Sequence, residues 1–184
     1  MSRLILVTGG ARSGKSRFAQ ERAMELQKST GGKVAFVATA QRVDQEMDAR
    51  IDRHQRDRPA DWTTVEAPMG AGEHVVALAR EHSVILLDCL TLLVSNVLWE
   101  ARDEAAEIVE ERVTQAARAL CAGARKGGDA TVIVVTNEVG MGLHPDHPIG
   151  RLFRDVAGRA NQIVAAQADE VVFMVCGLPM TVKQ

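Results

Sequence analysis

The sequence predicts an α/β protein with a mainly parallel sheet flanked by helices. Two observations support this class: short apolar runs rich in β-branched residues recur along the chain, and helix-like segments rich in Ala, Glu, Arg and Leu separate them. Strands that alternate with helices favour parallel pairing through right-handed crossovers. With 184 residues and 46% hydrophobic content, the chain is expected to form a single domain over residues 1–184.

The elements follow from these patterns in chain order. Strands are predicted at 4–8, 34–38, 84–87, 131–136 and 171–176, and helices at 15–28, 44–56, 73–81, 92–125 and 150–168. A last apolar run follows Gly177-Leu178-Pro179. Because this connection is too short for a crossover, the last two strands should form an antiparallel hairpin at one sheet edge. Residues 57–72 contain two Pro and two Gly and are expected to form a surface loop.

Composition excludes several classes of function. The 22 basic and 24 acidic residues give a net charge of -2, so nothing general attracts nucleic acid, and the absence of tyrosine leaves few aromatic platforms for stacking bases. The three cysteines, Cys89, Cys121 and Cys176, lack the spacing of a disulfide framework or a zinc site. No apolar run reaches the roughly 18 residues of a membrane span. A cytoplasmic protein with reduced cysteines is expected.

A phosphate-binding motif follows the first predicted strand. The segment "GGARSGKS" matches G-x-x-x-x-G-K-[ST] between a strand and a helix, which is the context of the P-loop NTPase fold. Its residues are Gly9, Gly10, Ala11, Arg12, Ser13, Gly14, Lys15 and Ser16. Lys15 is expected to reach the β- and γ-phosphates of a nucleotide, and Ser16 to offer a hydroxyl to Mg2+. The motif predicts nucleotide binding without specifying the reaction.

Two acidic residues end later apolar runs. Asp88 closes "SVILLD" and either holds the magnesium or caps the helix that follows; the metal partner that a phosphate loop requires favours the first interpretation. Glu138, in "TNEVGMG", could position a nucleophile or a metal-bound water, or could cap a turn together with Asn137. Both interpretations of Glu138 stay open.

Four of the five histidines give little sign of chemistry. His144 and His147 are three residues apart in "HPDHP", but the prolines forbid the helix that would align them on a metal, and no third ligand is evident. His74 and His82 lie in or next to a predicted surface helix and show no sign of a partner.

His54 lies in a predicted helix whose many charges nearly cancel, which is typical of a solvated surface. Its i, i+4, i+7 spacing from Met47 and Ile51, however, places it on the inward side. Arg50 and Arg58 are cations that suit a phosphate near it. Imidazole is also mostly neutral at pH 7 and is thus an available nucleophile. A core histidine and a reactive one both fit these residues.

The chain resembles the bifunctional adenosylcobinamide kinase/adenosylcobinamide-phosphate guanylyltransferases of cobalamin biosynthesis. The resemblance covers nearly the whole chain, in the order "GGARSGKS", "ATAQ", "DQEMDARIDRHQRDRPADWTTVE", "LLDCLT", "TNEVGMG" and "FRDVAGRANQ". It implies that ATP or GTP phosphorylates the aminopropanol hydroxyl of adenosylcobinamide. GTP then transfers GMP to the new phosphate through a GMP-histidine intermediate, giving adenosylcobinamide-GDP. The intermediate falls on His54, preceded here by Arg53 where some relatives have a second histidine.

The resemblance also implies further contacts and partners. Beyond the loop, contacts with the nucleotide are implied for Ala38, Thr39, Ala40, Gln55, Arg56, Asp57, Arg58, Glu66 and Asp88, with Mg2+ held by Ser16 and Asp88. Relatives form trimers, so a homotrimer is implied. A phosphate-loop kinase without nucleotidyl transfer, or a nucleotide-dependent switch, would share the loop but would not need a reactive His54.

Overall fold

A computed structural model describes residues 2–42, 45, 48 and 58–184. Its sheet has the order β3-β2-β4-β5-β1-β6-β7. The strands are β1 (Arg3–Gly9), β2 (Val34–Ala38), β3 (Thr63–Glu66), β4 (Val84–Asp88), β5 (Thr131–Val135), β6 (Glu170–Val175) and β7 (Leu178–Lys183). Every neighbouring pair is parallel except β6 and β7, which are antiparallel. The predicted parallel sheet with a C-terminal hairpin is confirmed.

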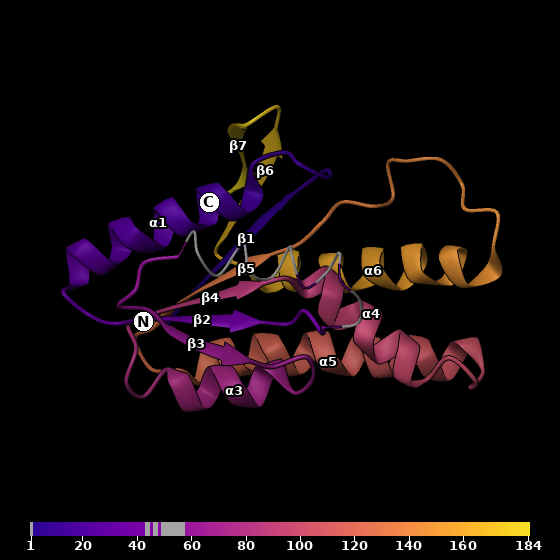
Figure 1. Ribbon diagram of the computed structural model, residues 1–184, viewed down its shortest axis with the longest axis horizontal. Helices are drawn as coiled ribbons and strands as arrows, with labels where there is room; N and C mark the ends of the chain where they lie inside the picture. Colours follow the sequence, from indigo (N-terminus) through magenta and orange to yellow (C-terminus); the bar gives the residue numbers. More distant parts are fainter. Residues whose placement is uncertain (1, 43–44, 46–47, 49–57) are drawn as a thin grey trace.

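Helices cover both faces of the sheet. They are α1 (Lys15–Thr30), α3 (Ala71–Leu78), α4 (Leu90–Glu100), α5 (Ala106–Lys126) and α6 (Pro148–Gln167). Figure 1 shows α1 on one face and the other four helices on the opposite face. Among the described ranges, no helix combines the length and hydrophobicity that crossing a bilayer requires.

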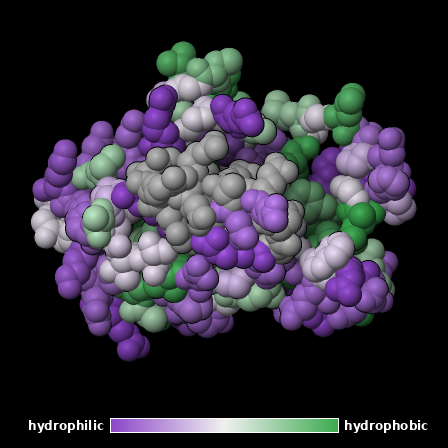
Figure 2. All heavy atoms as spheres, viewed as in Figure 1, coloured by the Kyte–Doolittle hydropathy of each residue, from purple (hydrophilic) through white to green (hydrophobic). Residues whose placement is uncertain are grey.

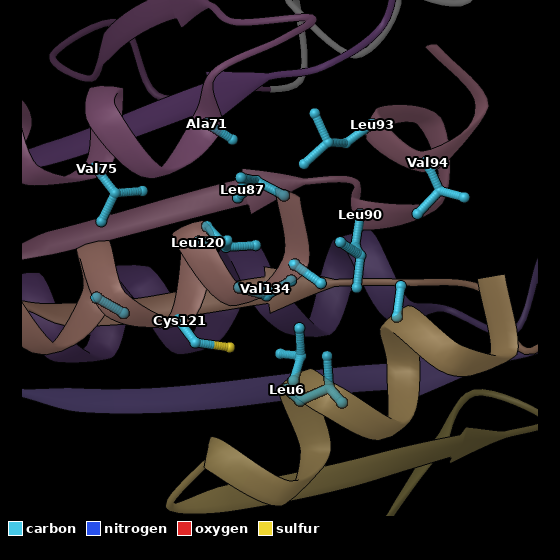
Figure 3. Packing of buried hydrophobic residues seen from close by; sticks show 14 of the residues in the cluster. Leu6, Ala71, Val75, Leu87, Leu90, Leu93, Val94, Leu120, Cys121 and Val134 are labelled. Carbon is cyan, nitrogen blue, oxygen red and sulfur yellow. The ribbon is translucent and has the colours of Figure 1, made fainter. Parts of the chain in front are cut away.

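Strand alternation divides the core into two layers. Leu4 and Leu6 of β1 pack toward α3–α6, whereas Ile5 and Val7 pack toward α1. Figure 3 shows the first layer, where side chains from β1, β4 and β5 meet those of α4 and α5. Because both faces of the central strands are buried, these strands are continuous apolar runs, and this explains why the sequence predicted them well.

The hairpin turns through two residues with positive φ. Cys176 has φ 52° and Gly177 has φ 83°, while Val175 and Leu178 pair on either side of them. Two consecutive positive φ values are the geometry of a type I′ turn, whose twist matches that of the flanking strands.

Two predictions about elements were wrong. The predicted loop 57–72 contains β3, which pairs with β2 at the sheet edge. The predicted helix 92–125 is two helices, α4 and α5, separated by residues 101–105. Local contacts span this break: Arg102 Nη1 donates to Trp99 O at 2.9 Å, and Arg112 pairs with Glu104 at 2.5 Å. The predicted helix 44–56 lies almost entirely outside the described residues.

Candidate nucleotide-binding site

The loop between β1 and α1 has a backbone that depends on its glycines. A Cβ on Gly9 would lie 2.6 Å from the carbonyl oxygen of Met174 and 2.9 Å from Ser13 Oγ, so a larger residue would collide with both β6 and the loop. Gly14 has φ 93°, a left-handed conformation that side chains rarely adopt. Arg12 also has positive φ, at 55°. The loop backbone therefore relies on glycine at positions 9 and 14.

The loop leads directly into α1, whose N-cap residue is a glycine. Gly14 is the N-cap residue, it makes no side-chain cap, and no acidic residue occupies the first turn. The N-terminal N–H groups of the helix and its dipole therefore favour an anion at this point. Ser16 lies within this first turn, as the motif predicted.

Lys15 lies over the loop. The residue is 7% exposed, and its Nζ donates to the carbonyl oxygen of Gly10 at 2.5 Å and to Ser13 Oγ at 3.4 Å. The N–H of Gly177 in the hairpin turn donates to Ser13 O at 3.1 Å. The ammonium group is thus held at the loop, and the loop is held by the far end of the sheet.

Three residues implied by the resemblance share one row of the sheet. Ala38 is the register partner of Glu66 on β3 and of Asp88 on β4. The carboxyl ends of parallel strands are where ligands bind in such sheets. Glu66 is exposed and Asp88 is half-buried, so neither residue is fully enclosed by the core at this edge. Ala40 follows two residues beyond β2, also half-buried.

Thr39 connects the ends of β2 and β4. It is fully buried, and its Oγ1 donates to Cys89 O at 2.7 Å and accepts from Cys89 N at 2.8 Å. Asn96 of α4 donates from Nδ2 to Thr39 O at 2.9 Å and to Pro68 O at 2.9 Å. Thr39 therefore fixes the spacing of the strand ends beneath the site. Sequence reasoning missed Asn96, whose only signal is an amide within the apolar helix α4.

Arg58 stacks its guanidinium on Phe36 of β2, 3.4 Å from the ring centroid, and its Nη1 lies 3.5 Å from Thr64 Oγ1. Burial lowers the pKa of Arg58, and the negative charge of Asp88 opposes that shift. The structure thus brings the Arg58 cation into the electrostatic range of Asp88, at the edge where Ala38 and Glu66 lie. The remaining implied residues of this stretch, His54, Gln55, Arg56 and Asp57, lie outside the described residues, as does Arg50.

The carboxylate of Glu138 caps a turn. Its Oε1 accepts from the N–H of Gly140 at 2.8 Å, and its own N–H donates to Gly9 O at 3.0 Å. Of the two interpretations left open, the described contacts favour the cap.

Two histidines outside the phosphate loop have hydrogen-bond partners. His144 Nδ1 lies 2.8 Å from Arg154 Nη1, and it accepts this hydrogen bond because a guanidinium can only donate. His82, which showed no sign of a partner in the sequence, is buried, with Nδ1 at 3.0 Å from Leu78 O and Nε2 at 3.0 Å from Thr63 Oγ1.

Comparison with known proteins shows which family this chain resembles over nearly its whole length. Residues 5–182 match the family described as cobinamide kinase / cobinamide phosphate guanyltransferase. The chain is similar to the bifunctional adenosylcobalamin biosynthesis protein CobU of Escherichia coli (39% identity, 98% of this chain and 99% of that protein). It is similar to the CobU protein of Salmonella typhimurium (41%, 98% and 99%) and to the corresponding CobP protein of Pseudomonas aeruginosa (39%, 97% and 96%).

Proposed function

The chain belongs to the cobinamide kinase / cobinamide phosphate guanyltransferase family, and we propose that one phosphate loop serves both of its reactions. The protein is a bifunctional enzyme of adenosylcobalamin biosynthesis. The observation that supports a shared site most directly is the position of Lys15, held over the loop at the amino end of α1. Both reactions need that cation, because each builds negative charge on phosphate oxygens.

The kinase reaction uses the substrate hydroxyl as the nucleophile. The aminopropanol oxygen of adenosylcobinamide attacks the γ-phosphorus of ATP or GTP, the bond to the β-γ bridging oxygen breaks, and a nucleoside diphosphate leaves. The hydroxyl proton passes to solvent. Lys15 and the amides at the start of α1 stabilise the charge that develops on the transferred group.

The guanylyl transfer uses His54 as the nucleophile. A neutral imidazole nitrogen attacks the α-phosphorus of GTP, the bond to the α-β bridging oxygen breaks, and pyrophosphate leaves. An oxygen of adenosylcobinamide phosphate then attacks the same phosphorus, and the P–N bond breaks. The products are adenosylcobinamide-GDP and the free histidine. This assignment of His54 rests on the family pattern around "DRHQRDRP".

The nucleotide site is proposed to include all residues implied by the resemblance. Arg58 would pair with phosphate, and Glu66 and Asp88 lie on the row that contains Ala38. Thr39 and Ala40 follow Ala38 along the same strand end. Since the main-chain groups and the hydroxyl of Thr39 already bond within the fold, its proposed part is to hold this edge in place.

The donor set at this edge fits Mg2+. Ser16 offers a hydroxyl in the first turn of α1, and Asp88 offers a carboxylate that makes no hydrogen bond or ion pair with the residues described. Helix α1 packs against β4, the strand that ends in Asp88. Hard oxygen ligands of this kind, completed by phosphate oxygens and water, are what magnesium takes. When bound, the ion would neutralise charge on the phosphates.

Turnover that depends on the corrinoid tests the enzymatic proposal. Purified protein is incubated with Mg·ATP, with and without adenosylcobinamide, and ADP is measured. The proposal predicts ADP formation that depends strictly on the corrinoid, and formation of adenosylcobinamide-GDP once GTP is added. Rapid hydrolysis without corrinoid would instead support a nucleotide switch. Phosphorylation without any GDP product would support a kinase that lacks guanylyl transfer.

The proposed homotrimer has a candidate contact surface on the hairpin. β7 is exposed along its whole length and carries Leu178, Met180 and Val182, exposed by 71%, 53% and 61%. Figure 2 shows hydrophobic residues at the top of the molecule, where the hairpin lies in Figure 1. Large exposed apolar side chains on an edge strand favour association with another chain. Light scattering after gel filtration tests this proposal: three chains per particle are expected, and fewer after Met180→Asp.

A further inference from the structure

A closed ring of hydrogen bonds surrounds the backbone of Asn137, just beyond β5. The N–H of Asn137 donates to Thr91 Oγ1 at 2.7 Å, and Thr91 Oγ1 lies 3.2 Å from Thr136 Oγ1. Thr136 Oγ1 donates to Asn161 Oδ1 at 2.7 Å, and Asn161 Nδ2 returns to Asn137 O at 3.1 Å. The ring joins β5 to α4 and α6.

The direction of every bond in this ring is determined. The single proton of Thr136 is donated to Asn161, so Thr91 must donate to Thr136. Thr91 and Thr136 are both buried, and such chains of bonds strengthen one another in a low dielectric. The N–H and C=O of Asn137 are both used, and this fixes the backbone of that residue.

The sheet ladder continues past the end of β5 and sets the direction of the Asn137 side chain. The N–H of Thr136 donates to Val7 O at 2.9 Å, and the N–H of Glu138 donates to Gly9 O at 3.0 Å. Thr136 faces α4 and α6, where its ring partners lie. Because side chains alternate along a paired strand, Asn137 faces the opposite side, which is the face of α1.

Asn137 therefore lies beside Gly9 on the face of the phosphate loop. The register Val7–Val135 extends to Gly9 and Asn137, and paired residues of parallel strands point to the same face. A Cβ on Gly9 would point toward Ser13 Oγ, 2.9 Å away in the loop. The half-buried carboxamide of Asn137 makes no hydrogen bond with any residue that the structure describes.

We infer that the Asn137 carboxamide donates a hydrogen bond to the terminal phosphate of the nucleotide bound at this loop. This inference rests on the proposed nucleotide site and adds to it a residue that distinguishes a triphosphate from a diphosphate. Thr91 and Asn161 are positioning residues, because their side chains bond the backbone N–H and C=O of Asn137. Thr136 is a positioning residue one step removed, because its hydroxyl joins Thr91 to Asn161.

The test compares a triphosphate analogue with a diphosphate. Affinities of the full-length protein for Mg-bound adenylyl imidodiphosphate and for Mg·ADP are measured by calorimetry. In Asn137→Ala the preference for the triphosphate should fall by about 10-fold or more, which is the size of a lost hydrogen bond to a charged group. Asn137→Asp should lose more, because a carboxylate repels phosphate. The kinase kcat should fall by about 10- to 100-fold in both variants.

A melting-temperature measurement and a control variant separate loss of binding from loss of folding. The ring uses only the backbone of Asn137, so Asn137→Ala should keep the melting temperature of the parent protein. Gln162→Ala removes an exposed amide on α6 and should change neither the affinity ratio nor kcat. An unchanged triphosphate preference in both Asn137 variants would overturn the inference. Failure of the parent protein to bind either nucleotide would contradict the proposed site and the inference together.

Discussion

The guanidinium of Arg58 lies over the Phe36 ring, with 3.4 Å between its central carbon and the ring centroid. Its Nε is buried and has no hydrogen-bond partner among the described residues. Burial lowers the pKa of this group, and the charge of Asp88 partly offsets the effect. Desolvation of a cation that lacks one of its hydrogen bonds is unfavourable in free energy, and a bound phosphate would offset it.

Replacing Arg58 with lysine should weaken nucleotide binding. Lysine keeps the charge but loses the planar group that stacks on Phe36 and can make two parallel bonds to a phosphate. We expect Kd for GTP to rise by about 10-fold in Arg58→Lys. Arg118→Lys, on the exposed side of α5, is the matched control and should leave Kd unchanged. Equal affinities for Arg58→Lys and the parent protein would argue against a phosphate contact.

Removing the Lys15 ammonium should damage both activities together. In Lys15→Ala we expect kcat for the kinase and for the guanylyl transfer each to fall by about 100-fold or more, because one cation stabilises both transition states. Lys126→Ala, at the exposed end of α5, should leave both rates unchanged. Product formation is measured separately for each step. Loss of only one activity would show that the two reactions use different phosphate sites.

Asp88→Asn should raise the magnesium requirement. An amide is a weaker ligand than a carboxylate for a hard divalent cation, so the Mg2+ concentration for half-maximal kinase rate should rise by about 10-fold. The titration is repeated with Asp103→Asn, an aspartate whose side chain is 87% exposed between α4 and α5. The same Mg2+ dependence in Asp88→Asn and the parent protein would leave Asp88 without the proposed role.

The Arg125–Asp169 pair should make stability depend on pH at the acid end. Two bonds of 2.9 Å join the side chains, and Leu4 N donates to Asp169 Oδ2 at 2.7 Å. The hydrogen bond from Arg125 is the main cause that holds the pKa of Asp169 below its ordinary value of 3.8. A carboxylate with a lowered folded pKa stabilises the protein above its unfolded value, and that stability is lost as the pH falls through the folded value.

Asp169→Asn should therefore cost stability at pH 6 but not in strong acid. The loss at pH 6 should be about 1 kcal/mol or less, because the pair is partly exposed and screened by solvent. Urea unfolding curves of the two proteins should converge as the pH falls below 3.8. Asp146→Asn, on an exposed loop, serves as the control. A difference that stays constant from pH 6 into acid would contradict this linkage.

The fold was largely predictable because its central strands are buried on both faces. Runs such as residues 84–88 can be recognised as buried strands from their apolar composition alone. β3 was missed because "TTVE" is short, has one apolar residue and becomes a strand only by pairing with β2. The break between α4 and α5 was missed because all its residues except Asp103 are good helix formers and none is glycine or proline.

The site was predictable only where its residues are neighbours in the sequence. The phosphate loop that leads to Lys15 is one contiguous segment, so its motif can be recognised directly. The Thr39–Cys89 pair and the Thr136–Asn161 bond join residues 50 and 25 positions apart, and no local pattern signals such contacts. The family pattern supplied Glu66, whose place on the Ala38 row became visible only in the sheet register.

Labelling with GTP carrying 32P at the α-phosphate tests the central claim most directly. After incubation with Mg2+, the denatured protein should carry label that is labile in acid and stable in base, as expected of a phosphoramidate. The label should be absent from His54→Ala and should leave the parent protein when adenosylcobinamide phosphate is added. Undiminished label on a folded His54→Ala variant, or no label on the active parent protein, would contradict the account.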